Sequence, residues 1–506
     1  MLALASAMAM APRTFSRAPR VMVVPMARDA ASNLPTSSRG SRWRPGDKLA
    51  RERWRERVSR HSPWWLVAAA VLTAALWLSH MPALLFHAQL YADDGGWYQG
   101  AYTLGPLASL PHPAAGYFVL FQRLIASISL LLPIIAVPTF FNVAALGVEI
   151  AGVCYLLSRR MTSAIPSLTV RISIALLLIA LPNAYDTSGN LTSTQWHLAL
   201  LAFLVMFASA SRRVAGHIVD ALIIVVSGLT GPYCILLEPI VASLWRRNRG
   251  DRRLKYLLIG NSVCAVAQFL VIVDRLTTER SASPLAAGFY PLVRMIGRQV
   301  ALGLIVGAHG LAAIASSFVA NNTAALTVLA VIPLAVCAWA AWRGPVILRA
   351  FCFFAYAVLG LALVAPSIAG LRWPSLGNAA DVMNFHPGGI RYFLYPLLAF
   401  AISLGWLVVT YVAPWLNQVS HERISSVATA QPATCRLLLI GRIVSLAAAT
   451  ALVGMVLVGM RVDWTYPPYL EEHWESQVHR LETAPRGTVV VIPINPQGWT
   501  VSLVAR

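Results

Sequence analysis

Two adjacent aspartates, Asp93 and Asp94, are the residues of this sequence whose type and spacing best suit chemistry. They lie in the stretch Tyr91-Ala-Asp-Asp-Gly-Gly-Trp-Tyr98, although the whole chain of 506 residues has only 20 acidic side chains. A carboxylate can accept a proton from a reacting hydroxyl as a general base. Because neighbouring residues of a helix point to different faces, we expect one aspartate to face a site. The other would hold it by hydrogen bonds or face water.

The residues that follow the acidic pair are suited to a bound sugar. Gly95 and Gly96 permit close approach of a backbone or a ligand. Trp97 and Tyr98 offer flat faces of the kind that stack on sugar rings. The alternative is a solvated turn whose aromatic residues anchor the membrane interface.

The composition predicts an all-α polytopic membrane protein. Hydrophobic residues make up 58% of the chain and charged residues 12%, with a mean hydropathy of +0.64, which is outside the usual range of soluble domains. The net charge of +20 lies in an N-terminal segment and in short clusters between apolar runs. That pattern indicates positive-inside topology and no nucleic-acid partner. The six cysteines are scattered singly, which favours neither a disulfide framework nor a zinc site.

Residues 1–62 are rich in Arg, Ser, Pro and Ala and have no sustained apolar period. We interpret them as a disordered, basic cytoplasmic tail that attracts anionic lipid. The alternative is an organellar transit peptide. Abundant Arg and Ala favour a bacterial coding bias, so we expect a multi-pass protein of the bacterial inner (plasma) membrane with a cytoplasmic N-terminus.

Residues 63–460 form the predicted membrane domain, with about eleven spans and at most about thirteen. The first span, 64–86, is long enough to cross ~30 Å of hydrocarbon, and the long loop 87–133 then lies outside. We treat 113–133 as a surface or re-entrant helix, because counting it as a span places later arginine clusters outside. We treat 299–320 in the same way. With an odd number of spans and a cytoplasmic N-terminus, the C-terminus is then expected outside.

The apolar run 217–245 is too long for one crossing and is interrupted by Gly228-Leu-Thr-Gly-Pro232. Gly and Pro at this point predict two half-length helices that meet at a kink. Lipid tolerates such a break only where the helices line a cavity or pack inside protein. The run therefore hints at a substrate chamber.

Residues 461–506 predict a small extracytoplasmic appendage. Apolar residues recur there at helical spacing, which predicts one amphipathic helix on the membrane or on the loops: Leu470, Trp474, Val478 and Leu481. The stretches 488–492 and 499–503 flank a turn-like segment and predict a β-hairpin. We expect the appendage to cap the outer loops, because so short a segment cannot form an independent catalytic domain.

An acidic pair in a long first outer loop, a surface helix after it and many spans around a broken helix occur together in this chain. This arrangement resembles the C-type (GT-C) glycosyltransferase superfamily. Four more stretches are similar to stretches in uncharacterised bacterial membrane proteins of this type: Asn190–Trp196, Gly228–Pro232, Arg391–Pro396 and Asn495–Trp499. The resemblance implies an enzyme that transfers a sugar from a polyprenyl-phosphate carrier to a cell-envelope glycan or lipid acceptor on the outer side. Only Asp93 and Asp94 match the family's catalytic position.

If the resemblance holds, the leaving lipid phosphate needs a cation near the outer interface. Arg391 is the first candidate, because it is preceded by His386-Pro-Gly-Gly389 in an outer loop that turns directly into a span; Arg372 and Arg294 are second choices. An arginine fork can hold two phosphate oxygens at once. The alternative for Arg391 is snorkelling to the membrane interface.

The loop 183–196 contains no basic residue, and Asp186 and Trp196 could bind the acceptor there. The alternative is a capped helix start with a tryptophan at the interface. The histidines near the first outer boundary have no metal-ligand spacing. We therefore assign no cofactor, and a divalent metal stays an open alternative.

Two other classes of protein fit a polytopic chain. A transporter or lipid flippase usually shows internal repeats and buried charges near the middle of the membrane, and no clear repeat is present here. An O-antigen polymerase or ligase-like envelope protein is the nearer alternative, because it also acts on carbohydrate.

Overall fold

A computed structural model describes residues 64–114, 116–275, 289–317, 319, 322–361, 390–412 and 453–506. The chain divides into two compact units, Met1–Trp65 and Leu66–Arg506. Of the first unit only Trp64 and Trp65 are described, and they begin helix α3 (Trp64–His80). The predicted tail 1–62 and two predicted site residues, His386 and Arg372, lie outside the described residues.

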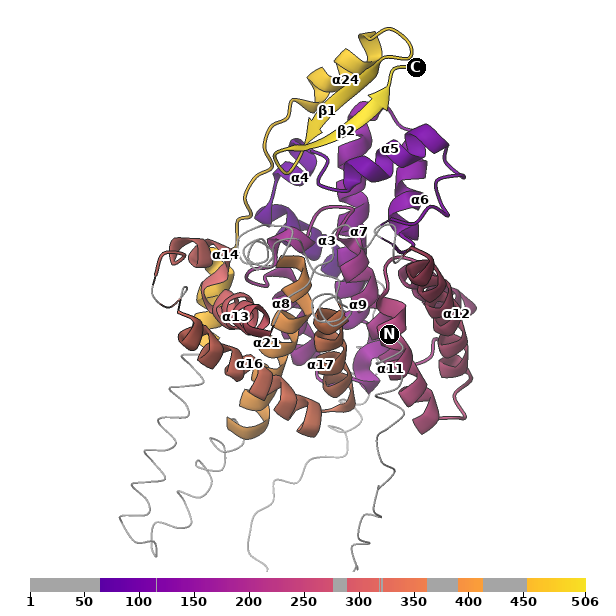
Figure 1. Cartoon of the computed structure of the whole chain (residues 1–506). Coiled ribbons are helices and arrows are strands. Elements are labelled where there is room, and N and C mark those ends of the chain that lie inside the picture. Colours follow the sequence, from indigo (N-terminus) through magenta and orange to yellow (C-terminus); the bar gives the residue numbers. More distant parts are fainter. Residues whose placement is uncertain are drawn as a thin grey trace, which may run out of the picture. The chain divides into compact units, whose positions relative to one another are not determined.

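The second unit is mostly helical, as predicted (Figure 1). Its first half contains α4 (Ala83–Phe86), α5 (Asp94–Leu104), α6 (Leu120–Ser129), η1 (Ile134–Ala136), α7 (Val137–Leu157), α8 (Leu168–Ile179), α9 (Thr194–Phe207), α10 (Val214–Gly228), α11 (Tyr233–Arg247) and α12 (Arg252–Arg275). Its second half contains α13 (Phe289–Met295), the π-helical η4 (Ile296–Leu302), α14 (Gly303–Ala313), α16 (Thr323–Arg343), α17 (Val346–Leu359), η6 (Arg391–Phe393), α21 (Leu394–Leu407), α24 (Trp474–Thr483), β1 (Val489–Ile494) and β2 (Trp499–Val504).

Among the described residues, five helices are long and apolar enough to cross a membrane: Ile134–Leu157, Arg252–Asp274, Leu292–Ala313, Thr323–Arg343 and Arg391–Tyr411. Six further apolar helices are shorter, and α3 and α9 are among them. Four of the five long helices coincide with predicted spans. The prediction of about eleven spans is not confirmed, and the predicted span 438–460 lies largely outside the described residues.

Two ambiguous stretches of the sequence behave differently in the structure. Helix α6 has 10 residues and is therefore ~15 Å long, which is too short to span and agrees with a surface helix. The run 299–320 was expected at the surface or re-entrant. Its residues 299–313 belong to the helical run Leu292–Ala313, which is long and apolar enough to span and is interrupted where Gly307 has a φ of 69°.

The break predicted near Gly228 is present, because α10 ends there and α11 begins at Tyr233. Asp220 in the first half of α10 bonds Arg253, the second residue of α12, and α12 starts only a few residues after α11 ends. The start of α10 and the end of α11 therefore lie at the same end of the bundle. The two helices form a helical hairpin, and a single kinked span is not what the structure shows.

The C-terminal segment forms the predicted helix and hairpin. Strands β1 and β2 pair antiparallel, with Val490 opposite Leu503 and Ile492 opposite Val501. In α24 the buried face is Trp474, Val478 and Leu481. Leu470 precedes the helix and is exposed, so its predicted place on the apolar face is wrong.

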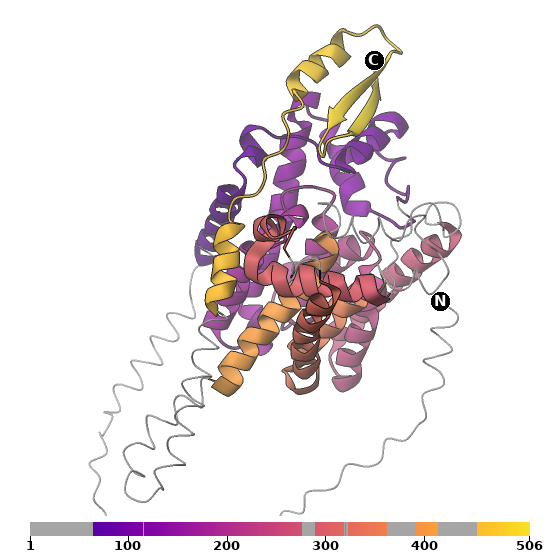
Figure 2. The ribbon, with the colours of Figure 1, turned by 60° about the vertical axis from the view of Figure 1, so that its left-hand side comes forward.

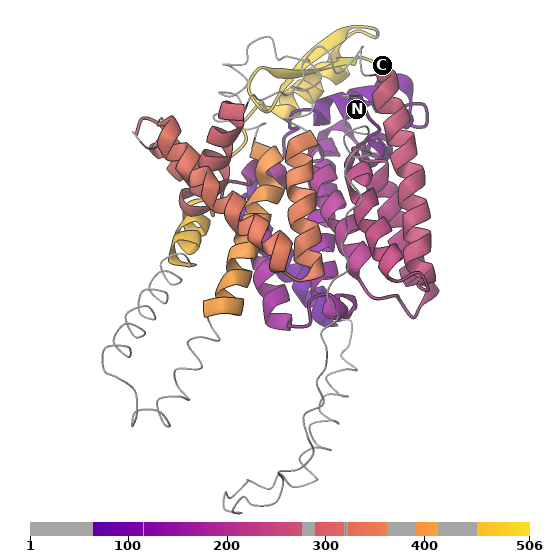
Figure 3. The same cartoon turned by 60° about the horizontal axis from the view of Figure 1, so that its bottom comes forward.

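The hairpin and α24 lie on α5 and its neighbours and share one apolar core with them (Figures 1 and 2). The hydroxyl of Tyr102 donates to the carbonyl of Val504 at 2.9 Å. Asn495 pairs by backbone hydrogen bonds with Leu90 at 3.0 Å and with Ala92 at 2.5 Å. The C-terminal segment therefore covers the loop that follows the first helix, as the sequence predicts. Seen from the other end, α16, α17 and α21 stand side by side (Figure 3).

Candidate functional site

The acidic pair begins α5. Asp93 is the N-cap residue and Asp94 is the first helical residue. Carboxylates are stabilised at this position, because the free N–H groups of a helix start carry partial positive charge. The two side chains nevertheless have different surroundings, as expected for neighbours in a helix.

Asp94 is fully buried and held by one residue of a distant loop. Its Oδ1 accepts hydrogen bonds from the backbone N–H of Thr192 at 2.7 Å and from the Thr192 hydroxyl at 2.6 Å. Its Oδ2 receives no hydrogen bond from any described residue. Burial raises the pKa of Asp94 to about 7, although the bonds from Thr192 act in the opposite direction. Asp94 is therefore a fixed, weakly acidic group.

Asp93 is partly exposed and faces a cation. Burial raises the pKa of Asp93, whereas the positive charge of Arg391 acts to lower it. Arg391 stands at the start of η6 and interacts electrostatically with both Asp93 and Asp186. The sequence predicted a guanidinium opposite one aspartate, and in the structure Arg391 is near enough to Asp93 for the two charges to influence each other.

Two tyrosines lie near the acidic pair: Tyr91 precedes Asp93 by two residues, and Tyr469 interacts electrostatically with Asp94. The hydroxyl of Tyr91 donates to Oδ1 of Asp186 at 2.8 Å. The ring of Tyr469, from the C-terminal segment, stacks on Tyr91 with 5.3 Å between the ring centroids. Burial raises the pKa of both tyrosines, and the charge of Asp186 raises it further. Both therefore stay protonated at neutral pH, and Tyr91 acts as a hydrogen-bond donor to Asp186.

The loop that supplies Asp186 and Thr192 was predicted to be a neutral outer loop that could bind the acceptor. In the structure nearly every residue from 181 to 197 is buried. Asn190 ties the loop to itself, because its Nδ2 donates to the carbonyls of Asp186 and Ser188 and its Oδ1 accepts from the N–H of Ser193. The loop is thus held by its own hydrogen bonds and packs against Asp94 through Thr192.

The predicted sugar-stacking residues lie in the core. Tyr98 has 1% of its surface exposed and packs under the hairpin. Trp97 is buried too, with the guanidinium of Arg123 5.2 Å from its ring centroid. The structure therefore gives Tyr98 a packing role in place of the predicted stacking role, and the face of Trp97 holds an arginine.

Trp196 belongs to an aromatic cluster next to Arg391. Its ring centroid lies 5.2 Å from that of Tyr233, 5.5 Å from Tyr392 and 5.6 Å from Tyr395. Trp196 is 2% exposed and packs against Tyr392 and Tyr395, which lie in η6 and α21. Arg294 lies on α13 beside Arg298, and no contact between described residues joins it to the acidic pair.

Sequence reasoning missed Thr192, Tyr469 and Glu149. Glu149 lies inside a predicted span and is 4% exposed. Its Oε1 accepts from the N–H of Gly189 at 2.9 Å and is 3.7 Å from Nε2 of His197. An acidic residue in an apolar run is costly and tends to be functional, and that signal could have found it. No local signal marks Thr192 or Tyr469, because their contacts join distant segments.

A cavity of about 10 Å³ lies between Glu149, His197 and Trp77. Oε2 of Glu149 and Nε1 of Trp77 have no hydrogen-bond partner among the described residues. Such a space holds about one water molecule, which needs two or more polar partners. The cavity thus fits a single buried water that bridges polar groups beneath the site.

No family model, curated protein or solved structure matches this chain. Within the described ranges, no group of three or more His, Cys, Asp and Glu residues could hold a metal ion. The site is therefore characterised by its own geometry: two unlike carboxylates at a helix start, a guanidinium near one of them, and tyrosines that hold the surrounding loops.

Proposed function

We propose that this protein is an integral membrane glycosyltransferase of the C-type (GT-C) kind. It would move a sugar from a polyprenyl-phosphate carrier to a cell-envelope glycan or lipid acceptor on the extracytoplasmic side of the bacterial inner membrane. The observation that supports the proposal is the electrostatic attraction between the partly exposed Asp93 and Arg391. One group suits proton removal and the other suits a leaving phosphate.

In this mechanism Asp93 is the general base and Asp94 is a positioning residue. Asp93 takes the proton from the acceptor hydroxyl while the hydroxyl oxygen attacks the anomeric carbon of the sugar. The bond from that carbon to the phosphate oxygen breaks, and the lipid phosphate leaves with the bonding electrons. Arg391 stabilises the charge that develops on the phosphate. Asp94 is too deeply enclosed to reach the hydroxyl, and its bonds to Thr192 fix the start of α5.

The test is complementation of a deletion strain, read as its surface glycan and glycolipid profile. We expect Asp93→Asn and Arg391→Gln to lower transfer at least about a hundredfold, because a general base contributes about 10²–10⁴-fold. Asp94→Asn keeps the Thr192 bonds through its amide oxygen, so substantial transfer should remain. Glu475→Gln, an exposed acid of α24, is the matched control.

The outcomes separate the roles. If Asp93→Asn keeps full transfer and Asp94→Asn loses it, the general base would be Asp94 and not Asp93. Full transfer by both Asp93→Asn and Asp94→Asn, each present in the membrane at the wild-type amount, would contradict the proposal that this site catalyses glycosyl transfer.

A proton-linked transporter is the second candidate, and the buried Glu149 beside His197 favours it. Ionisable side chains inside an apolar helix often lie on a proton path. A transporter mutant would keep its surface glycans and lose uptake of a solute, so the same deletion strain distinguishes the two classes.

A further inference from the structure

A groove of about 510 Å³ runs between α10 and α12, far along the chain from the acidic pair. Its apolar lining comes from both helices: Ile218, Ala221, Ile224, Val225, Leu257 and Gly260. Ile224 and Leu257 are buried and form the floor. A volume of this size lies within the usual range of ligand pockets.

The two helices run parallel along the groove. Asp220 of α10 bonds Arg253 of α12 near one end, and Gly260 lies against Ile224 further along both helices. Both helix N-termini therefore open at the same end of the groove. At the start of α10 no described side chain caps the first N–H groups, which therefore give that end a partial positive charge. At the start of α12 the N–H groups of Arg253 and Leu254 instead donate to Oδ1 of Asp251.

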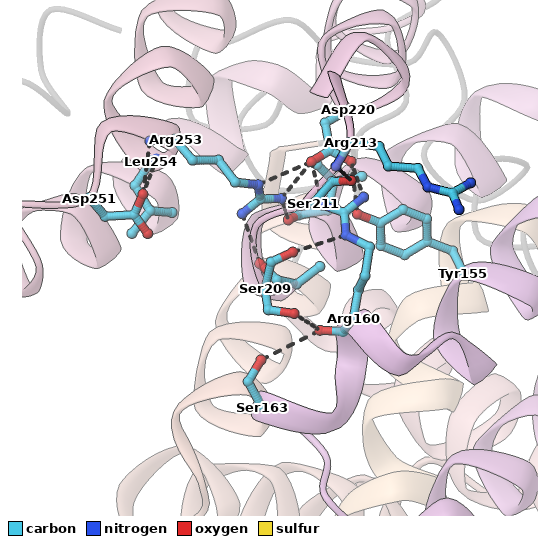
Figure 4. A network of polar contacts seen from close by, with 12 residues as sticks. Tyr155, Arg160, Ser163, Ser209, Ser211, Arg213, Asp220, Asp251, Arg253 and Leu254 are labelled. Atoms are coloured by element: carbon cyan, nitrogen blue, oxygen red, sulfur yellow. Dashed lines mark hydrogen bonds and ion pairs between the residues drawn. The ribbon is translucent and has the colours of Figure 1, made fainter. Parts of the chain in front are cut away.

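Basic side chains gather at this same end (Figure 4). Arg160 contacts Asp220 through two hydrogen bonds, of 2.7 and 2.5 Å, and Arg253 contacts the same carboxylate at 3.0 Å. Tyr155 donates to it as well, at 3.0 Å. Two guanidinium groups thus share one carboxylate, which leaves a net positive charge at a buried point.

Two further lining residues are exposed at this end and available to a ligand. Arg252 begins α12 and His217 lies in the second turn of α10. Within the ranges that the structure describes, neither side chain has a hydrogen bond or ion pair. Arg253 is not available in this way, because it also donates to the carbonyls of Ala208 and Val205.

We propose that this groove binds one anionic phospholipid. An acyl chain lies along the apolar floor, and the phosphate sits at the shared N-terminal end with Arg252 and His217. Charge at one end and an apolar length behind it complement an amphiphile with an anionic head and do not suit a zwitterionic one as well. The proposal does not depend on the glycosyltransferase assignment.

Native mass spectrometry of the full chain in detergent tests this proposal. Phosphatidylglycerol and phosphatidylcholine with identical acyl chains are added to the delipidated protein. We expect phosphatidylglycerol to be retained about fivefold better, since a basic residue near an anionic lipid surface contributes about 1 kcal/mol. Arg252→Gln should remove that preference. Arg247→Gln, an exposed arginine at the same end that does not line the groove, should keep it.

A second pair of variants tests the apolar part. Ala221→Leu fills the groove and should lower the retention of both lipids, whereas Ala215→Leu, exposed on the same helix and outside the lining, should not. Equal retention of the two lipids by the wild type, or equal loss in Arg252→Gln and Arg247→Gln, would overturn the proposal. Full displacement of phosphatidylglycerol by inorganic phosphate would overturn it too, because the acyl chain would then add nothing.

Discussion

Asp94 and Thr192 show how a single residue pair joins distant parts of this chain. They are 98 positions apart, yet both donors of Thr192 serve one carboxylate oxygen. The sequence identified Asp94 as a candidate because acidic residues are scarce beside a membrane span. It could not identify Thr192, because threonine is common in polar loops where it has no functional role. The division of roles between Asp93 and Asp94 likewise depends on burial, which only the fold determines.

The raised pKa of Asp94 predicts a pH dependence of stability. Its folded pKa of about 7 exceeds the ordinary value of 3.8, so between these values the folded state binds more protons than the unfolded state. Stability should therefore fall as pH rises from about 4 to about 7 and change no further above that. Asp94→Asn removes the buried charge, so this component should disappear and the variant should unfold at a higher temperature than wild type at pH 8.

Thermal unfolding of the detergent-solubilised protein across this pH range is the measurement. The exposed Glu475→Gln variant should retain the wild-type slope. An Asp94→Asn protein with the wild-type slope would mean that Asp94 does not titrate in this window.

At the scale of elements, α5 and the C-terminal hairpin approach each other at Gly95. A Cβ atom on Gly95 would lie 2.6 Å from Cδ1 of Ile494 and 3.2 Å from Cβ of Val501. The sequence predicted α5's glycines as places of close approach and predicted the hairpin as a cap. It left open what approaches Gly95, because pairing between distant elements leaves no periodic signal.

The glycine pair offers a matched test of this contact. Gly95→Ala should lower the free energy of unfolding by about 1–3 kcal/mol, because it overpacks the contact with the hairpin. Gly96→Ala meets no atom within 4 Å and should be neutral or stabilising by up to about 1 kcal/mol, because alanine favours the helix. Chemical denaturation of both variants checks the difference, and equal stabilities would mean that the hairpin does not rest on α5.

Across the whole molecule, the class of protein was the easiest feature to predict and the number of spans the hardest. Apolar runs such as 134–157 and 324–342 give a strong and local signal. Runs such as 113–133 and 299–320 do not, because length and polarity there fit a surface helix and a span equally well. Asn495 forms backbone hydrogen bonds with Leu90 and Ala92, so we expect both segments to lie on the same side of the membrane.

Cysteine labelling from each side of the membrane checks this arrangement. Pro111 and Arg486 are exposed near the site, and Gly250 is exposed at the opposite end of the bundle. Cysteines at positions 111 and 486 should label from the extracytoplasmic side, and one at position 250 only from the cytoplasm. The parent protein is the control, since its described cysteines are buried or partly buried. Labelling of 111 and 486 from opposite sides would contradict the structure.

The contact of Tyr469 and Asn495 with the Tyr91 region also sets an order of events during biosynthesis. The ribosome synthesises residues 90–94 long before residues 469–495. During that interval the early segment lacks its contacts with the C-terminal segment. A chain that ends before the hairpin therefore contains Asp93 and Asp94 but lacks the contacts of Tyr469 and Asn495 with the Tyr91 region. Premature termination should yield an inert protein and not a partly working one.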